Sequence, residues 1–407
     1  MTPTSGRSTS TPDAAEKLST WLAIDGRAYV RNLHTFRRIV GPDVLLMAVL
    51  KANAYGHGAR TLTPLAVAEG VDYIGVNSLD EFQEIRDLAG EVPVCLLGPT
   101  LPNQAEAVVA AGVEPTVSML ETLAALAAAA RAGGRTVAVH VKVETGTHRQ
   151  GVPPEEIPAW CTWLRDHAEV RLRGLHTHFA NIEDTTDHTY ARLQMARLAE
   201  ARQAFATLGA APELTHSACS AATIVMPPTH RDLVRLGISG YGLWPSRETL
   251  LSTLLTHVTD PDLVPVLSWH ARIAQIKETA AGEFVGYGCA FRATHAMRLA
   301  VLPVGYYDGY DRRLSAQAYV LAPGGRRAPV VGRICMNMLM IDITDLPDVA
   351  LGEPVTLIGQ SGGEVIPVDA LARLCGTIHY EFAARLGRHL PRLLTGCDPA
   401  GAEAARP

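Results

Sequence analysis

The sequence predicts an α/β protein with an N-terminal (β/α)₈ barrel of the TIM type followed by a mostly β domain. Between about residues 32 and 250, short apolar and β-branched runs alternate with helical-looking segments. Repeated βα units are typical of a parallel sheet, and eight of them favour a closed barrel over an open sheet. After about residue 260 the pattern changes to strand-turn-strand, with Gly and Pro at the turns. The length of 407 residues allows one large and one smaller domain.

Eight short runs have the composition of buried parallel strands. They are Leu45–Leu50, Tyr73–Val76, Val92–Leu97, Glu114–Ser118, Val137–Val143, Leu172–Phe179, Leu214–Ser217 and Leu233–Arg235. Two of the helices between them are marked by their ends. Ser78–Leu88 begins with an N-cap-like serine followed by Glu81 three residues later, and the Ala-rich Leu120–Ala132 ends at two glycines.

Domain boundaries follow from these patterns. Residues 1–20 are rich in Ser, Thr and Pro, which predicts a disordered tail. The run Trp21–Ile24 (WLAI) is expected to add a strand to the second domain. The expected division is therefore 1–20 tail, 21–31 added strand, 32–255 barrel, 256–395 β domain and 396–407 loose tail.

Composition favours a small-molecule ligand in a reducing compartment. The net charge of -5 is small for this length and the charges are interspersed, so neither nucleic acid nor an anionic membrane is an expected partner. Seven scattered cysteines form no metal-ligand spacing and predict reduced thiols, no metal and a cytoplasmic location. The first twenty residues lack the apolar stretch of a secretory signal, and no later run reaches membrane-spanning length.

Lys51 ends an unbroken apolar run, in LLMAVLKANAYGHG. The C-terminal end of a barrel strand is where barrel enzymes keep their chemistry. Partial desolvation and nearby cations lower the pKa of an amine, which suits Schiff-base formation with an aldehyde. Taken alone, such a lysine better fits a side chain that snorkels or pairs at the barrel rim, and it is the neighbouring residues that reverse this preference.

KANAYGHG resembles the cofactor-lysine motif of the alanine racemase family, and the similarity continues in order along the chain. The further blocks are VKVETGTHRQG (Val141–Gly151), GLHTHFAN (Gly174–Asn181), HSACSAA (His216–Ala222), VRLGISGYGLWPS (Val234–Ser246), VGYGCAF (Val285–Phe291), PVGYYDGYDR (Pro303–Arg312), VGRICMNMLMID (Val331–Asp342) and GTIHYEFAARLGRHLPR (Gly376–Arg392). Together they cover about residues 21 to 393, which is far more specific than one short motif. The resemblance implies a pyridoxal 5'-phosphate (PLP) enzyme that interconverts L-alanine and D-alanine as a homodimer with shared active sites.

The resemblance also assigns cofactor-binding residues. Lys51 is expected to carry PLP as a Schiff base. Ser220, the backbone amides of Gly237 and Ile238, and the Tyr55 hydroxyl are expected to hold the phosphate, because amides and hydroxyls can do so without a bulky charge. In the predicted barrel, Ser220 and Gly237 follow strands seven and eight, where this fold usually binds phosphate.

Three further residues are expected around the cofactor ring. Arg149 resembles the arginine that contacts the phenolic oxygen and the substrate carboxylate, and His178 resembles the histidine packed against the ring. Arg235 matches the arginine that faces the pyridine nitrogen and leaves it largely unprotonated, which discourages transamination. Without the resemblance, His178 would fit a satisfied barrel histidine and Arg235 a rim salt bridge. Lys142 matches a position that carries a carbamate in some relatives.

Racemisation requires the α-proton to leave one face of the amino acid and return on the other, so two acid/base groups must stand on opposite sides. By resemblance these are Lys51 and Tyr287, the latter supplied by the second subunit. Alone, Tyr287 would fit an ordinary core tyrosine. Met336 is expected to meet the substrate carboxylate through its amide, Tyr306 to lie at the entrance, and Asn337 to lie near the substrate.

Three departures from the family pattern leave the substrate side chain open. Asn337 stands where Asp is common, which removes a negative charge near the expected substrate carboxylate. Thr147 and His148 precede Arg149 where small or apolar residues are usual, and Arg388 stands where some members have a phosphate-side tyrosine. Pocket walls discriminate among amino acids, so a racemase of another amino acid such as serine is the first alternative.

Two other classes remain as rivals at this stage. A PLP decarboxylase of basic amino acids shares the cofactor lysine and the two-domain plan, but its Gly-rich phosphate loop and its cysteine-containing motif are not evident in the sequence. A non-catalytic PLP carrier would be a lone barrel, which the predicted second domain opposes.

Overall fold

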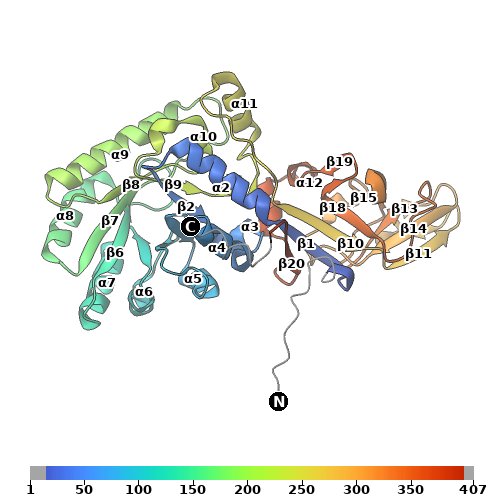
Figure 1. Cartoon of the computed structure of the whole chain (residues 1–407), viewed down its shortest axis with the longest axis horizontal. Coiled ribbons are helices and arrows are strands. Elements are labelled where there is room, and N and C mark those ends of the chain that lie inside the picture. The colour runs from blue at the N-terminus through green and yellow to red at the C-terminus, as the bar shows by residue number, and fades with distance from the viewer. Residues whose placement is uncertain (1–14, 398–407) are drawn as a thin grey trace, which may run out of the picture. The chain divides into compact units, whose positions relative to one another are not determined.

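The computed structural model describes residues 15–397, drawn in colour in Figure 1. Contacts divide the chain into two units. The barrel unit comprises Ala28–Ala54 and Leu62–Pro265. The β unit comprises, among the described residues, 15–27, 55–61 and 266–397. The sequence-based boundaries place residues 55–61 in the barrel, whereas in the structure this segment packs with the β unit.

The barrel unit contains eight parallel strands, as the sequence predicts. They are β2 (Leu45–Val49), β3 (Tyr73–Val76), β4 (Val94–Leu96), β5 (Glu114–Val117), β6 (Val137–Lys142), β7 (Val170–His176), β8 (Leu214–His216) and β9 (Leu233–Leu236). Their order is β8-β7-β6-β5-β4-β3-β2-β9. The two end strands approach each other, because the Asp232 amide donates to the Thr215 carbonyl at 3.1 Å and the Arg235 amide to the Ala218 carbonyl at 3.0 Å. The sheet is thus a nearly closed barrel, and the predicted fold class is confirmed.

Helices follow most strands and lie outside the barrel (Figure 1). They are α2 (Gly26–Val40), α4 (Ala59–Ala68), α5 (Leu79–Ile85), α6 (Ala105–Ala111), α7 (Leu120–Ala132), α8 (Ile157–Asp166), α9 (Thr189–Thr207), α10 (Ser220–Val225) and α11 (Arg247–Thr256). α7 has the predicted bounds, and α5 is capped by the Ser78 hydroxyl, which accepts from the Glu81 amide at 3.4 Å. Across residues 15–397, none of the helices combines the length and apolar character needed to cross a membrane.

The β unit is built on one large, mostly antiparallel sheet. Its path is β11-β14-β17-β16-β15-β18-β10-β1-β20, with β19 paired to β18, and β12 and β13 form a separate two-stranded ladder. The strands are β1 (Thr20–Asp25), β10 (Leu267–Arg272), β11 (Gln275–Thr279), β12 (Phe284–Val285), β13 (Phe291–Arg292), β14 (Met297–Leu302), β15 (Tyr319–Ala322), β16 (Arg326–Val331), β17 (Leu339–Asp342), β18 (Pro354–Ser361), β19 (Glu364–Ile366) and β20 (Arg392–Thr395). Two helices, α12 (Val368–Leu374) and α13 (His379–Ala384), follow β19. The N-terminal strand β1, expected at Trp21–Ile24, lies between β10 and β20.

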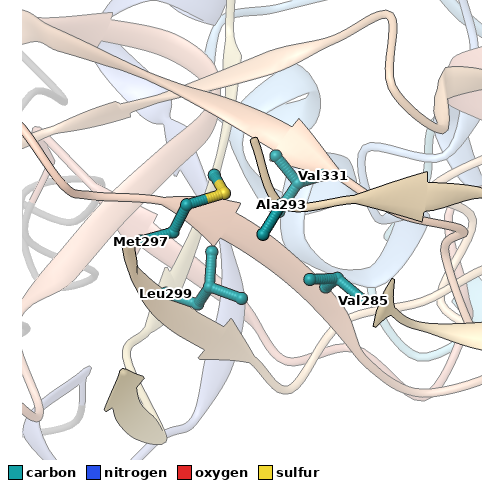
Figure 2. Packing of buried hydrophobic residues seen from close by; sticks show 5 residues of the cluster. All are labelled: Val285, Ala293, Met297, Leu299 and Val331. Atoms are coloured by element: carbon teal, nitrogen blue, oxygen red, sulfur yellow. The ribbon is translucent and has the colours of Figure 1, made fainter. Parts of the chain in front are cut away.

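A small apolar core fixes the β12–β13 hairpin to the large sheet. Figure 2 shows its five buried members, Val285, Ala293, Met297, Leu299 and Val331. They come from β12, the residue after β13, β14 and β16, and burying a valine, leucine or methionine side chain contributes about 1.5–3 kcal/mol. The segment between β12 and β13, which contains Tyr287, is therefore anchored at both ends.

Candidate functional site

Lys51 is the second residue after β2 and begins a left-handed turn, α3 (Lys51–Tyr55). The four residues after the lysine have φ between 52° and 54° although none is glycine. Left-handed backbone costs about 1–2 kcal/mol for each such residue, and strain of this kind concentrates at functional sites. Two hydrogen bonds stabilise the turn. The Ala54 amide donates to the Leu50 carbonyl at 2.7 Å, and the Ala52 amide donates to the Glu81 carboxylate at 2.7 Å.

The electrostatic surroundings of Lys51 suit a reactive amine. Burial lowers the pKa of Lys51, and the positive charges of Arg149 and Arg235 lower it further, against the opposing effects of Glu81 and Glu183. A larger fraction of this amine is therefore uncharged near neutrality than for an ordinary lysine. Only the uncharged form is nucleophilic.

Ser220 and the segment after β9 form a cradle of polar groups. The Ser220 hydroxyl is buried at the start of α10 and accepts from the amide of Gly237 at 3.0 Å and of Ser239 at 3.4 Å. Ile238 begins the 3₁₀ helix Ile238–Tyr241. The buried Ser239 hydroxyl has no hydrogen-bond partner among residues 15–397. Ser220, Gly237 and Ile238 thus lie together as predicted, and Ser239 is a neighbour that the sequence did not single out.

Arg149 is exposed in the loop after β6, and hydrogen bonds with α9 and with the segment after β7 stabilise this loop. The Tyr190 hydroxyl donates to the Gly146 carbonyl at 3.0 Å, and the Arg197 guanidinium to the Thr145 carbonyl at 2.8 Å. The Thr147 hydroxyl donates to the His178 carbonyl at 2.6 Å. Thr147, a departure from the family pattern, therefore links the Arg149 loop to the segment that carries His178.

Arg235 is buried inside the barrel and contacts the segments after β7 and β8. Its guanidinium donates to the carbonyls of Thr177 and Ser217, both at 2.9 Å, and lies 3.3 Å from Nδ1 of His178. Burial and the Arg235 charge hold the pKa of His178 well below its usual range, so this half-buried imidazole is neutral. Arg235 is thus fixed by several acceptors, unlike a rim salt bridge, which would face a carboxylate.

Lys142 ends β6 and is buried beside the same cations. Burial, together with the charges of Arg149 and Arg235, lowers the pKa of Lys142 to about 8. In this environment the amine readily loses its proton.

Among residues 15–397, no group of three or more His, Cys, Asp or Glu side chains is arranged to hold a metal ion.

Tyr287 lies in the β unit, between β12 and β13, and the residue is 71% exposed. The glycines on either side have φ of 76° and 71°, a conformation that a side chain would strain. Tyr287 lines an open groove of about 710 Å³ together with Phe284, Cys335 and Met338. The ordinary core tyrosine considered from sequence alone is therefore excluded.

The loops that contain Tyr306 and Met336 pack against each other in the same unit. The Tyr306 amide donates to the Cys335 carbonyl at 3.1 Å, and the Tyr307 amide to the Met336 carbonyl at 3.0 Å. A Cβ added at Gly305 would lie 2.3 Å from the Met336 carbonyl oxygen, so this close approach requires glycine. Asn337 is exposed in the same loop. Three of the predicted substrate-side residues are thus neighbours.

Tyr55 belongs to the β unit although it is only four residues from Lys51. Its ring lies 6.1 Å from that of Tyr380 in α13, and the next residue, Gly56, has no room for a Cβ because of the Ala383 carbonyl at 1.9 Å. Arg388, the third departure from the family pattern, is exposed in this unit. The KANAYGHG motif therefore contributes residues to both units.

Sequence reasoning missed a row of polar side chains inside the barrel. Glu114, His140, His176 and His216 lie on β5, β6, β7 and β8, and the three histidines are buried. Barrel interiors are usually filled by branched apolar side chains. The sequence does show a histidine in each of three consecutive predicted strands. Whether these side chains point into the barrel and meet one another depends on the strand register, which the sequence does not specify.

Comparisons with known proteins place this arrangement in a family. Residues 24–245 match the model "Alanine racemase, N-terminal domain" and residues 266–394 match "Alanine racemase, C-terminal domain". The chain is 40% identical over 373 residues to the alanine racemase of Desulfovibrio desulfuricans, covering 92% of this chain and 97% of that protein.

Solved structures agree. The alanine racemase of Bacillus anthracis with bound L-Ala-P superposes with a TM-score of 0.85 at 30% identity, covering 93% of this chain and 96% of that one. A histidine racemase from Leuconostoc mesenteroides superposes with a TM-score of 0.82 at 27% identity, covering 93% and 98%.

Proposed function

Since the chain belongs to the alanine racemase family, we propose that Lys51 and Tyr287 are the two proton-transferring side chains of a PLP-dependent alanine racemase. The protein is an isomerase and its cofactor is PLP. The observation that carries the residue assignment is the environment of Lys51, a strand-end amine whose pKa is lowered by burial and by Arg149 and Arg235.

The residues that follow β2, β8 and β9 fit PLP. The hydroxyls of Ser220 and Ser239 and the amide of Ile238 offer donors for a phosphate, and the Gly237 amide, which donates to the Ser220 hydroxyl in this structure, would be shared with it. Lys51 would bind the cofactor covalently, and Tyr55 would add a hydroxyl to the phosphate. Bound PLP withdraws electrons from the α-carbon of the amino acid and so lowers the cost of removing the α-proton.

Lys51 and Tyr287 would divide the proton transfers between the two faces of the amino acid. The lowered pKa leaves more of the Lys51 amine uncharged than in an ordinary lysine, so it can accept a proton more readily. Tyr287 is exposed and lines an open groove, so its hydroxyl is accessible to a substrate. Lys51 would serve one enantiomer and Tyr287 the other, which accounts for a reversible reaction.

Arg235 and Arg149 would orient the reacting groups. The guanidinium of Arg235 stays charged and donates hydrogen bonds, so it can face a ring nitrogen without giving up a proton. His178, neutral because of its lowered pKa, can pack against the ring without adding charge. Arg149 would bind the substrate carboxylate, and the backbone amide of Met336 together with Tyr306 and Asn337 would complete the substrate side.

We also propose a homodimer in which Tyr287 serves the Lys51 of the partner. Phe284, Tyr287, Tyr307, Met336 and Met338 are each more than half exposed in the β unit. Large apolar side chains exposed together mark protein interaction sites. A second copy that covers this groove would bring Tyr287 to a catalytic centre and remove these side chains from water.

A reducing cytoplasm fits the thiols and is the proposed location. Cys95, Cys161 and Cys375 are buried free thiols. Lys142 is proposed as a carbamate site, since a buried amine with a pKa of about 8 is available for reaction with carbon dioxide. Extra density on the Lys142 nitrogen in a crystal structure would support the carbamate, whereas a bare ammonium paired with an acid would exclude it.

A racemase of another amino acid is the second candidate, because Asn337 departs from the family pattern and a histidine racemase shares the fold. A chiral assay of alanine, serine and histidine with wild type, Lys51→Ala and Tyr287→Phe separates the two. We expect inversion of alanine with kcat/KM at least about tenfold above the others, and loss of inversion in both variants. Preference for serine or histidine would favour the second candidate. Failure to invert any of the three would contradict both.

A further inference from the structure

The polar row inside the barrel is a continuous chain of hydrogen bonds that ends at Arg235. The Arg235 guanidinium lies 2.7 Å from Nδ1 of His216, and Nε2 of His216 lies 3.0 Å from Nδ1 of His140. Nε2 of His140 in turn lies 2.8 Å from the Glu114 carboxylate. The side chains of Arg235, His216 and His140 are buried, and only 13% of the Glu114 side chain is exposed.

Strand register explains how these four side chains meet. Thr116 and His140 are partners in the β5–β6 ladder, His140 and Gly174 in the β6–β7 ladder, and His176 and His216 in the β7–β8 ladder. The His140 ring occupies the space where a side chain at position 174 would lie, since a Cβ on Gly174 would be 2.0 Å from His140 Nδ1. The missing side chain of β7 thereby lets β6 and β8 exchange a hydrogen bond across it.

The groups at the two ends of this row of hydrogen bonds, Arg235 and Glu114, fix the direction of each bond in it. Arginine has no acceptor, so Arg235 donates and Nδ1 of His216 accepts. His216 is neutral because burial and the Arg235 charge hold its pKa well below the usual range, so its proton is on Nε2. That proton is donated to Nδ1 of His140, whose own proton must therefore be on Nε2, facing Glu114.

Glu114 is an ionised acceptor at the far end. Burial alone would raise its pKa, but hydrogen bonds from His140 and Tyr73 and the positive charge of Arg173 bring the net pKa below the usual value. His176 lies beside this row of side chains but makes no hydrogen bond to its members. Its ring stacks on His216 at 4.6 Å with an interplanar angle of 2°, and its pKa is held low by burial.

We propose that Glu114 and His140 are positioning residues that act through His216 to keep Arg235 oriented as a hydrogen-bond donor toward the cofactor ring. We call this row of hydrogen-bonded side chains, from Glu114 through His140 and His216, the Glu114 relay. It holds one nitrogen of the Arg235 guanidinium, while the Thr177 and Ser217 carbonyls hold another. It also keeps both histidines in their Nε2–H form, so neither can hand a proton toward the ring. This inference rests on the proposed role of Arg235 and extends it to residues on the opposite side of the barrel interior.

Imidazole ¹⁵N NMR of the holoenzyme tests the tautomers without measuring activity. We expect His216 and His140, identified by comparison with His216→Gln and His140→Gln, to be neutral with the proton on Nε2. An imidazolium, or an Nδ1–H form at either residue, would overturn the proposal. In Glu114→Ala, His140 loses its acceptor and should populate the other tautomer, whereas in Glu114→Gln the amide oxygen still accepts and the wild-type tautomers should remain.

Kinetics test the consequence for Arg235. We expect Glu114→Ala to lower kcat by about tenfold or more with a smaller change in KM, as replacing a residue that orients a site residue typically does, and Glu114→Gln to restore most of the loss. The fraction of turnovers that end in transamination should rise in Glu114→Ala. Glu169→Ala is the matched control, since Glu169 pairs with Arg131 in the same unit and contacts none of the residues that hold Glu114.

The outcomes separate this inference from the proposed function. Equal kcat and equal transamination in the Glu114→Ala and Glu169→Ala variants would overturn the positioning role of Glu114 while leaving the racemase assignment intact. A wild-type enzyme that inverts no amino acid would overturn the proposed function instead. If Glu114→Ala fails to fold, the wild-type tautomers and the Glu114→Gln kinetics still decide the question.

Discussion

Replacing Gly174 with alanine tests the packing inside the barrel most sharply. An ideal Cβ at this position lies 2.0 Å from His140 Nδ1, whereas ordinary contact begins at 3.4 Å. The His140 ring, which is fully buried, must therefore move by about 1.4 Å or the strand must deform. Either movement breaks the 3.0 Å hydrogen bond between His140 and His216.

The cost can be worked from these contacts. Overpacking a buried site costs about 1–3 kcal/mol, and each buried polar group left without a partner costs about 1–3 kcal/mol. The lower entropy of the unfolded alanine chain offsets about 0.4–1 kcal/mol. We expect Gly174→Ala to lower the free energy of barrel opening by about 2–5 kcal/mol.

Hydrogen exchange of the β6 and β7 amides is the appropriate assay, because a global unfolding curve mixes the two units. Gly133→Ala is the matched control. Gly133 ends α7 with φ of -85°, and an added Cβ would meet no atom closer than 3.4 Å. The control should change the opening free energy by less than about 1 kcal/mol, in the stabilising direction. Equal protection in the two variants would refute the steric reasoning.

Three further predictions follow from the site. Lys51→Ala should abolish the absorbance band of covalently bound PLP, and a band that persists would move the attachment to another lysine. Ser220→Ala should weaken PLP binding by about tenfold, measured by titration with the cofactor, because it removes one hydroxyl and the acceptor of two amides; an unchanged Kd would show that the phosphate lies elsewhere. Because folding lowers the pKa of Lys142 from about 10.4 to about 8, folded protein binds fewer protons than unfolded protein between these values, so stability should rise from pH 8 to pH 10 by about 2–3 kcal/mol. Denaturant unfolding of wild type and Lys142→Met in CO₂-free buffer checks this, and an equal rise in both would assign the effect to other groups.

Apolar continuity made much of the barrel predictable. The eight expected strands correspond to β2–β9, with ends that differ by a few residues, because runs such as Leu45–Leu50 are apolar on both faces. The bounds of α7 were predictable because alanine favours helix and two glycines end it. Lys51, Ser220 and Gly237 could be placed near one mouth because each follows or ends a predicted strand.

Features that depend on long-range packing were not predictable. The left-handed turn after Lys51 contains no glycine in its four strained residues, so local propensity gives no sign of it. Residues 55–61 join the β unit because Gly56 packs on α13, more than 300 residues away in the chain. The Glu114 relay depends on strand register and on the absent side chain of Gly174.

Subunit complementation tests the central claim most directly. Lys51→Ala and Tyr287→Phe are each expected to be inactive, but a mixed dimer would contain one site with an intact lysine from one subunit and an intact tyrosine from the other. Random reassociation of equal amounts should therefore restore about one quarter of wild-type alanine racemisation. If the mixture of reassociated subunits stays as inactive as the separate variants, Lys51 and Tyr287 do not act on one substrate across the dimer, and the account is contradicted.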